Sequence, residues 1–193
     1  PRLEDGPDGE HLPDRLAKET IAFLESEHPR PFFTYLSFYS VHSPWMARED
    51  LKMKYEKKDK PADEWRQERW IKFAKAQNNP VYAAMIESMD TAIGDVLNTL
   101  KRTGQDKNTV VIFVSDNGGA SEVTSNAPLR AGKCYLFEGG IRVPLIVSWP
   151  GQIEAGSVTD VPVTSTDFYP TLLDLAGIPQ TPEQHMDGSS FAS

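Results

Sequence analysis

A β-branched run over residues 109–115 constrains the fold more than any other feature of this chain. It reads TVVIFVS, a composition that favours a strand. An amphipathic helical pattern over 80–104 precedes it, with Gly104 predicted at the C-terminal cap. A second apolar run follows over 143–149. Helices that alternate with buried strands predict an α/β fold, with helices on the faces of the sheet.

Two further helices and one more strand complete the predicted pattern. The spacing of apolar residues over 14–27 predicts a helix with Asp14 as its N-cap. The aromatic run over 32–38 predicts a buried strand of a parallel sheet. Residues 165–176 predict a helix that is capped at its start by short polar side chains and at its end by Gly177.

The segment 48–75 differs from the rest of the chain in its charges. It carries 10 of the 20 Lys and Arg residues together with 7 Asp and Glu residues. Trp65, Arg69, Lys72 and Phe73 have spacings compatible with a surface helix. Because faces of mixed charge are usually solvated, we expect an exposed excursion. A basic groove for an anionic polymer is the alternative.

Composition excludes several functional classes. The net charge of −8 argues against a general nucleic-acid binder. A single cysteine excludes an internal disulfide framework and a cysteine-rich zinc site. The longest uncharged run, 31–47, is too short and too polar to cross a bilayer. The chain starts without Met or an apolar signal segment, so we expect it to be trimmed or part of a longer protein.

The first candidate site follows the strand predicted over 109–115. Ligands of open α/β sheets bind beyond the carboxyl ends of strands, and Asp116 and Asn117 lie at that position. Their carboxylate and amide oxygens are hard donors that suit Ca²⁺ or Mg²⁺ better than Zn²⁺. Because Asn-Gly is also a common turn dipeptide, a turn without a ligand is the alternative.

Two cationic side chains are further candidates. His42 follows the strand predicted over 32–38, where an imidazole can donate to an anionic oxygen and shuttle a proton. Lys133 lies next to a glycine on a loop and can meet an anion as a point charge. For both residues, a solvated loop position without a special role is the alternative.

The loop that contains Lys133 carries other signals. Cys134 is followed by Tyr-Leu-Phe, which predicts a small buried residue rather than a nucleophile. The adjacent Gly139 and Gly140 predict a positive φ or a close approach of two backbones. Arg142 is predicted to pair with an acidic neighbour.

Five motifs occur in an order that is strongly specific together, although each is modest alone. The motifs are PFFTYLSFYSVHSP at 31–44, YAAMIESMD at 82–90, VSDNGG at 114–119, GK with FEGGIRVP at 132–144, and TSTDFYPTLLDLAG at 164–177. In this order they resemble the type I, formylglycine-dependent sulfatase (arylsulfatase) family of the alkaline phosphatase superfamily, and the similarity covers nearly the whole chain.

The resemblance implies a fold and an activity. The fold is an α/β/α sandwich with a mostly parallel sheet, and the reaction is hydrolysis of sulfate esters. Asp116 and Asn117 resemble the second pair of Ca²⁺ ligands in the family, with Mg²⁺ as the alternative ion. Lys133 resembles the lysine that contacts the sulfate ester, and His42 the histidine that hydrogen-bonds the sulfate or the leaving oxygen.

The resemblance also implies what lies outside this chain. No Cys/Ser-x-Pro/Ala-x-Arg motif occurs, so the formylglycine and the first pair of metal-ligating aspartates are expected upstream of residue 1. We therefore expect residues 1–193 to be an incomplete catalytic domain that is inactive alone. The expected substrate is a sulfated small molecule or saccharide, and export from the cytoplasm is expected. A phosphate or phosphonate ester hydrolase and a non-catalytic anion-binding homologue are the alternatives.

Overall fold

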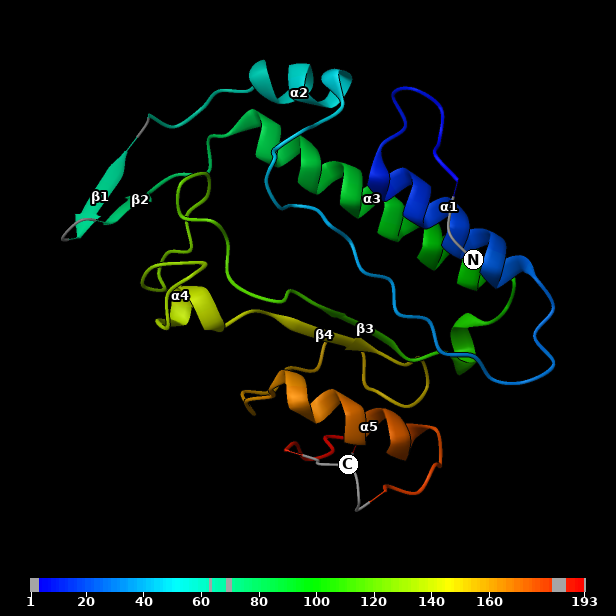
Figure 1. Cartoon of the computed structure of the whole chain (residues 1–193). Coiled ribbons are helices and arrows are strands. Elements are labelled where there is room, and N and C mark those ends of the chain that lie inside the picture. Colours follow the sequence, from blue (N-terminus) through cyan, green and yellow to red (C-terminus); the bar gives the residue numbers. More distant parts are fainter. Residues whose placement is uncertain (1–3, 63, 69–70, 182–186, 193) are drawn as a thin grey trace. The chain divides into compact units, whose positions relative to one another are not determined.

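The computed structural model of this protein forms two compact units, Pro1–Ile153 and Glu154–Ser193, and each is described by itself. The structure describes every residue except 1–3, 63, 69–70, 182–186 and 193 (Figure 1). In the described part of the chain, no helix combines the length and the apolar character that a bilayer crossing requires.

Two long helices form the main core of the first unit. Helix α1 (Leu12–Glu25) packs against α3 (Pro80–Arg102), so both predicted helices are confirmed (Figure 1). Asp14 lies in the first turn of α1 and not at its N-cap, because Pro13 presets helical φ and starts the helix earlier. The end of α3 is as predicted, since Gly104 follows it with φ +72°.

Small residues are buried on both of these helices. Ala17 of α1 is 3% exposed, and Ala84 and Ala92 of α3 are 0% and 2% exposed. Small side chains on packed faces let helix axes approach closely. Leu24 and Met85 add larger buried surface beside them.

The segment 48–75 is not the surface helix that its spacing predicted. It contains the short helix α2 (Glu49–Glu56) and an antiparallel hairpin of β1 (Trp65–Glu68) and β2 (Ile71–Ala74). Trp65 and Phe73 lie in strands because aromatic side chains fit a pleated surface better than a helix of mixed charge. Lys72 lies over the Trp65 ring, 4.3 Å from its centroid. Arg69 falls outside the described residues.

The mixed charges of α2 are paired at the surface, as predicted for a solvated excursion. The helix buries none of its residues. Arg48 contacts Asp50 at 2.8 Å, and Lys54 contacts Glu87 of α3. The ammonium of Lys54 holds the pKa of Glu87 below its usual range.

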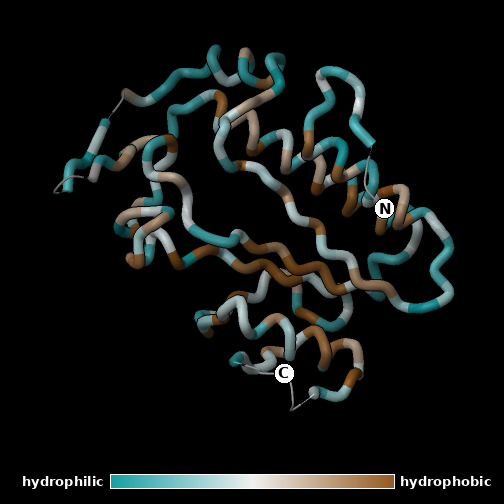
Figure 2. The backbone as a smooth tube through the Cα atoms, viewed as in Figure 1, coloured by the Kyte–Doolittle hydropathy of each residue, from teal (hydrophilic) through white to brown (hydrophobic). Residues whose placement is uncertain are grey.

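The two best predicted strands are confirmed and pair with each other. Strand β3 (Val111–Val114) lies antiparallel to β4 (Leu145–Ser148), with Val111 opposite Ser148. The pair is the most continuous hydrophobic stretch of the backbone in Figure 2. Within the described residues, both sheets have two strands and are antiparallel, and no parallel pairing occurs.

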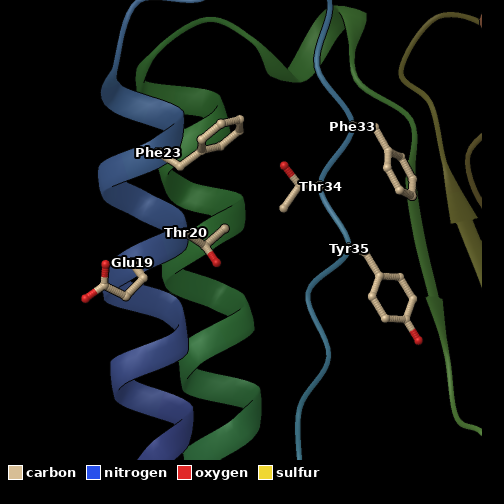
Figure 3. A pocket seen from close by; sticks show the side chains of 6 residues that line it. All are labelled: Glu19, Thr20, Phe23, Phe33, Thr34 and Tyr35. Atoms are coloured by element: carbon tan, nitrogen blue, oxygen red, sulfur yellow. The ribbon is translucent and has the colours of Figure 1, made fainter. Parts of the chain in front are cut away.

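The buried strand predicted over 32–38 is absent. The segment runs as an extended trace, with Thr34 pointing toward α1 and both Phe33 and Tyr35 pointing to the other side (Figure 3). This alternation is that of a strand. However, a strand also needs a hydrogen-bonded neighbour, and no described segment provides one. Phe33 and Tyr35 are consequently 69% and 82% exposed.

The second unit contains the predicted C-terminal helix. A short 3₁₀ turn (η2, Ser165–Asp167) leads into α5 (Phe168–Leu175). Thr164 and Asp167 form a capping box at its start, and Gly177 has φ +63° just beyond its end.

The last described residues are tied to this helix. The amide of Ser189 donates to Asp167 Oδ1 at 2.8 Å, and that of Phe191 donates to Thr171 Oγ1 at 3.0 Å. Backbone amides of Thr164 and Ser189 therefore hold the pKa of Asp167 below its ordinary value. Asp167 thus joins the helix start to a segment 22 residues away.

Candidate functional site

The loop between β3 and β4, residues 118–140, is closed by its own backbone. The Gly118 amide donates to the Gly140 carbonyl at 2.9 Å, and the Gly139 amide donates to the Arg130 carbonyl at 2.8 Å. Helix α4 (Glu138–Ile141) forms the end of this loop. Backbone hydrogen bonds therefore hold the two ends of the loop together.

Glycines make this closure possible. A Cβ on Gly118 would lie 1.7 Å from the Gly139 oxygen, and one on Gly132 would lie 2.4 Å from the Gly119 oxygen. Neither space admits a side chain. The close backbone approach predicted from the glycine pair 139–140 is confirmed, because Gly139 itself would place a Cβ 2.4 Å from the Ala131 oxygen.

The left-handed backbone of the loop lies at residues that are not glycine. Ala131 has φ +65° and Cys134 has φ +73°. Cys134 is exposed and its neighbour Leu136 is 90% exposed, so the prediction of a buried cysteine is wrong. The local apolar sequence was misleading because the turn at Cys134 directs these side chains outward. Non-glycine residues in this region of φ are uncommon and mark a site with a specific local demand.

Lys133 is held in this loop by its backbone. Its amide donates to the Gly119 carbonyl at 3.0 Å, which places Lys133 next to the residues that follow β3. The side chain is half-buried and makes no ion pair within the described chain. Arg130, on the same loop, instead contacts Glu68 at 2.7 Å. Lys133 is therefore the loop cation left available for an anion.

Asp116 and Asn117 follow β3 directly. The Asn117 Nδ2 donates to Asp116 Oδ2 at 2.6 Å, which orients the amide and leaves the Asn117 Oδ1 without a hydrogen-bond partner among the described residues. Ser115 Oγ donates to the Asn117 carbonyl at 2.8 Å. Both side chains offer hard oxygen atoms of the kind that Ca²⁺ and Mg²⁺ prefer.

The donor set at this position is only partial. Among the described residues, no group of three or more His, Cys, Asp or Glu side chains could hold a metal ion. A Ca²⁺ shell takes six to eight oxygen atoms. Asp116 and Asn117 fit such an ion in chemistry and would supply two of its ligands.

His42 lies apart from this loop in its contacts. Its Nδ1–H donates to the Ser43 carbonyl at 2.7 Å, since a carbonyl oxygen only accepts. The Tyr39 ring lies 5.2 Å away, and the Tyr39 hydroxyl donates to the same carbonyl. This arrangement orients the ring of an exposed residue and leaves Nε2 without a hydrogen-bond partner among the described residues. The backbone bond to Gly119 links Lys133 to the segment after β3, whereas no hydrogen bond or ion pair among the described residues joins His42 to either.

The hairpin β1–β2 lies against the Lys133 loop, which sequence reasoning did not predict. Phe73 meets Tyr135 edge-on with ring centroids 6.0 Å apart, and Glu68 pairs with Arg130. The Ala74 amide donates to the Ser121 carbonyl at 2.8 Å. The excursion thus borders the candidate site.

Two amide side chains that carry no sequence signal also shape the loop. Gln77 Nε2 donates to the Ser125 carbonyl at 2.8 Å, and its Oε1 accepts from the Ser125 amide at 3.2 Å. Asn126 makes a comparable pair of bonds with Gly119.

Arg142 pairs with Glu138 at 3.4 Å, as predicted.

A separate pocket of about 320 Å³ lies beside α1 (Figure 3). Glu19, the carboxylate on its rim, is paired with Arg15 at 2.7 Å. None of the four predicted site residues lines it. The pocket therefore lies outside the candidate site. Its lining residues are Glu19, Thr20, Phe23, Phe33, Thr34 and Tyr35.

Comparison with known proteins identifies the family. The sulfatase family model matches residues 2–178. A sulfatase of Formosa agariphila is 41% identical over 196 aligned residues, which cover 95% of this chain and 33% of that protein. The steryl-sulfatase of Rattus norvegicus is 33% identical over 92% of this chain and 28% of its own length. The chain therefore spans about a third of the length of these curated relatives.

Solved structures agree in fold. The structure of Ps i-CgsB in complex with k-i-k-neocarrahexaose superposes with a TM-score of 0.79 at 31% identity, covering 96% of this chain and 38% of that one. A sulfatase structure from a glycosaminoglycan locus of Bacteroides thetaiotaomicron gives a TM-score of 0.73 at 26% identity, over 93% of this chain and 38% of the other. The structural neighbours include sulfatases with an alkaline-phosphatase-like α/β fold. This chain belongs to the sulfatase family.

Proposed function

We propose that the full-length protein hydrolyses sulfate esters and that the loop of residues 118–140 forms part of its anion site. One observation carries this proposal: the Lys133 amide is bonded to Gly119, two residues beyond Asn117. This bond places the residue that carries a free ammonium next to the segment that carries the two hard oxygen donors, Asp116 and Asn117. This combination suits a tetrahedral anion next to a divalent cation.

In this proposal each residue has a defined task. Lys133 contacts a sulfate oxygen as a point charge. His42, as an imidazolium that donates from both ring nitrogens, directs its Nε2–H to a sulfate or leaving oxygen. Asp116 and Asn117 are the ligands that this chain would supply to Ca²⁺, with Mg²⁺ as the alternative. A bound divalent cation would neutralise charge on the ester oxygens. In this proposal, the full-length protein supplies the formylglycine nucleophile from outside residues 1–193.

We also propose that residues 1–193 form the later part of an α/β/α catalytic domain. In the complete domain, the extended segment over 32–38 joins a mostly parallel sheet. Its strand-like alternation and the high exposure of Phe33 and Tyr35 support this arrangement. The 193-residue chain alone is expected to give no turnover.

The proposed substrate class is a sulfated saccharide. The structure of Ps i-CgsB was solved with the oligosaccharide k-i-k-neocarrahexaose. The alignment with it covers 96% of this chain and 38% of Ps i-CgsB. Loops on a rigid scaffold usually set specificity. The hairpin β1–β2, which borders the Lys133 loop, is the element of this chain best placed to contact the sugar.

Sulfate release tests the proposal directly. The full-length protein, incubated with a sulfated oligosaccharide and Ca²⁺, should release inorganic sulfate that ion chromatography detects. Lys133→Ala should lower kcat/KM about 100- to 1,000-fold, since it removes one charge that stabilises the transition state. Lys107→Ala, at an exposed lysine of the 3₁₀ turn η1 (Asp106–Asn108), is the matched control and should leave kcat/KM unchanged.

Two results would contradict different parts of the proposal. Absence of sulfate release from every sulfated saccharide and aryl sulfate tested would reject sulfatase activity. Normal kcat/KM in Lys133→Ala, with the wild type active, would remove only Lys133 from the site.

A further inference from the structure

We propose that Asn126 is a positioning residue for Lys133, acting through the peptide group of Gly119. This inference rests on the proposed contact between Lys133 and the sulfate. Asn126 lies seven residues beyond Gly119 and seven before Lys133, and it forms no part of the sequence motifs that identify the loop. Its role follows only from the folded geometry.

The Asn126 side chain forms hydrogen bonds with both polar backbone groups of Gly119. Its Oδ1 accepts from the Gly119 amide at 2.8 Å, and its Nδ2 donates to the Gly119 carbonyl at 3.0 Å. A carboxamide is the short side chain that carries one acceptor and one donor side by side. The two hydrogen bonds fix the orientation of Gly119, as bonds between neighbouring strands of a β-sheet would.

The same Gly119 carbonyl also accepts the amide of Lys133, at 3.0 Å. The carbonyl oxygen has two lone pairs, and both are therefore used, one by Asn126 and one by Lys133. Any rotation of Gly119 would move the origin of the Lys133 side chain. Asn126 thus sets where the lysine leaves the backbone.

The Asn126 side chain packs closely against two glycines of the loop. A Cβ on Gly132 would lie 2.5 Å from Asn126 Nδ2, and a Cβ on Gly119 would lie 3.1 Å from Asn126 Oδ1. The side chain fills the space between these two glycines. Its removal would therefore leave a gap at the point that joins Gly119 to Lys133.

Gln77 provides a matched control on the same loop. It also makes two bonds to one residue, with the amide and the carbonyl of Ser125. Ser125, unlike Gly119, does not accept the Lys133 amide. Loss of Gln77 should weaken the loop without a specific effect on Lys133.

A double-mutant cycle in the full-length protein tests the inference. Asn126→Ala should lower kcat/KM for sulfate release about 10- to 100-fold in the wild-type background, the usual effect of misplacing a group at a site. In the Lys133→Ala background it should lower kcat/KM less than about 3-fold, because the group that it positions is gone. Gln77→Ala should have the same effect in both backgrounds.

A second substitution covers the case in which Asn126→Ala fails to fold. Asn126→Asp keeps the shape and the acceptor for the Gly119 amide but loses the donor to the Gly119 carbonyl. It should show the same dependence on Lys133. Equal effects of either substitution in both backgrounds would overturn the positioning role. Normal activity of Lys133→Ala would instead reject the proposed role of Lys133, and this inference with it.

Discussion

The loop 118–140 and the segment 31–44 both carry proposed site residues, yet they are held in opposite ways. The loop closes on itself through bonds such as Gly118 to Gly140, and its glycines pack against backbone. The segment 31–44 contains Phe33 and Tyr35 with more than two thirds of their surface exposed. Its bonds around His42 are local ones, to Tyr39 and Ser43.

This contrast separates two ways to position a functional group. Lys133 depends on contacts that are complete within this chain. His42 has a fixed ring orientation, but the backbone before it has the form of a strand that pairs with no described segment. We infer that the position of His42 depends on the rest of the domain much more than that of Lys133 does.

The largest expected effect is at Gly118. Gly118→Ala would force a methyl group to within 1.7 Å of the Gly139 oxygen, where only backbone can yield. We expect it to lower the free energy of unfolding by about 3 kcal/mol or more, measured by urea denaturation. Gly94→Ala in α3, which meets nothing within 4 Å, is the control and should raise it by up to about 1 kcal/mol. A small loss at Gly118 would show that the loop tolerates opening.

Amide hydrogen exchange should show the contrast directly in the 193-residue chain. The amides of Gly118, Lys133 and Gly139 donate to carbonyls, whereas those of 33–37 have no partner among the described residues. The three loop amides should exchange at least about 10-fold more slowly. Equal rates in both regions would break the comparison. In the full-length protein, new protection over 33–37 would support pairing with the rest of the sheet.

The smallest effect is expected in the second unit, which resembles the loop because it is tied by its own bonds. The pKa of Asp167 is lowered by amides that donate to its carboxylate, so its contribution to stability is present above the ordinary pKa of 3.8. That contribution is lost as the pH falls through the lowered value. Asp167→Asn should lower Tm at pH 7, with a difference from the wild type that shrinks below about pH 3.8.

The control for this experiment is Asp160→Asn, which changes an exposed carboxylate in the same unit. Its difference from the wild type should be small at both pH values. A Tm difference for Asp167→Asn that stays constant as the pH falls would show that charge at this residue contributes nothing.

Local patterns predicted the elements that local forces determine. The apolar spacing of α3 and the β-branched run of β3 gave the right structures, because each depends on neighbours along the chain. The start of the C-terminal helix was predicted from the short polar side chains of residues 165–167, although the capping box itself pairs Asp167 with Thr164. Membership of the sulfatase family was predicted from five motifs in order and is confirmed.

Features that depend on distant contacts were missed or wrong. The run at 32–38 has strand geometry but pairs with no described strand. The local sequence of a run does not show which segment will pair with it. Trp65 and Phe73 kept helical spacing but lie in a hairpin that packs on Tyr135. The role of Asn126 depends on where a chain reversal places Gly119, which no local pattern reports.

The exposed thiol of Cys134 has a practical consequence. It is the single cysteine of these 193 residues and lies on the surface, one position from Lys133. A maleimide fluorophore or a spin label could be attached there without any substitution. Such a reporter would test the proposed binding of an anion at the neighbouring ammonium, and would allow binding to be titrated in a chain that is expected not to turn substrate over.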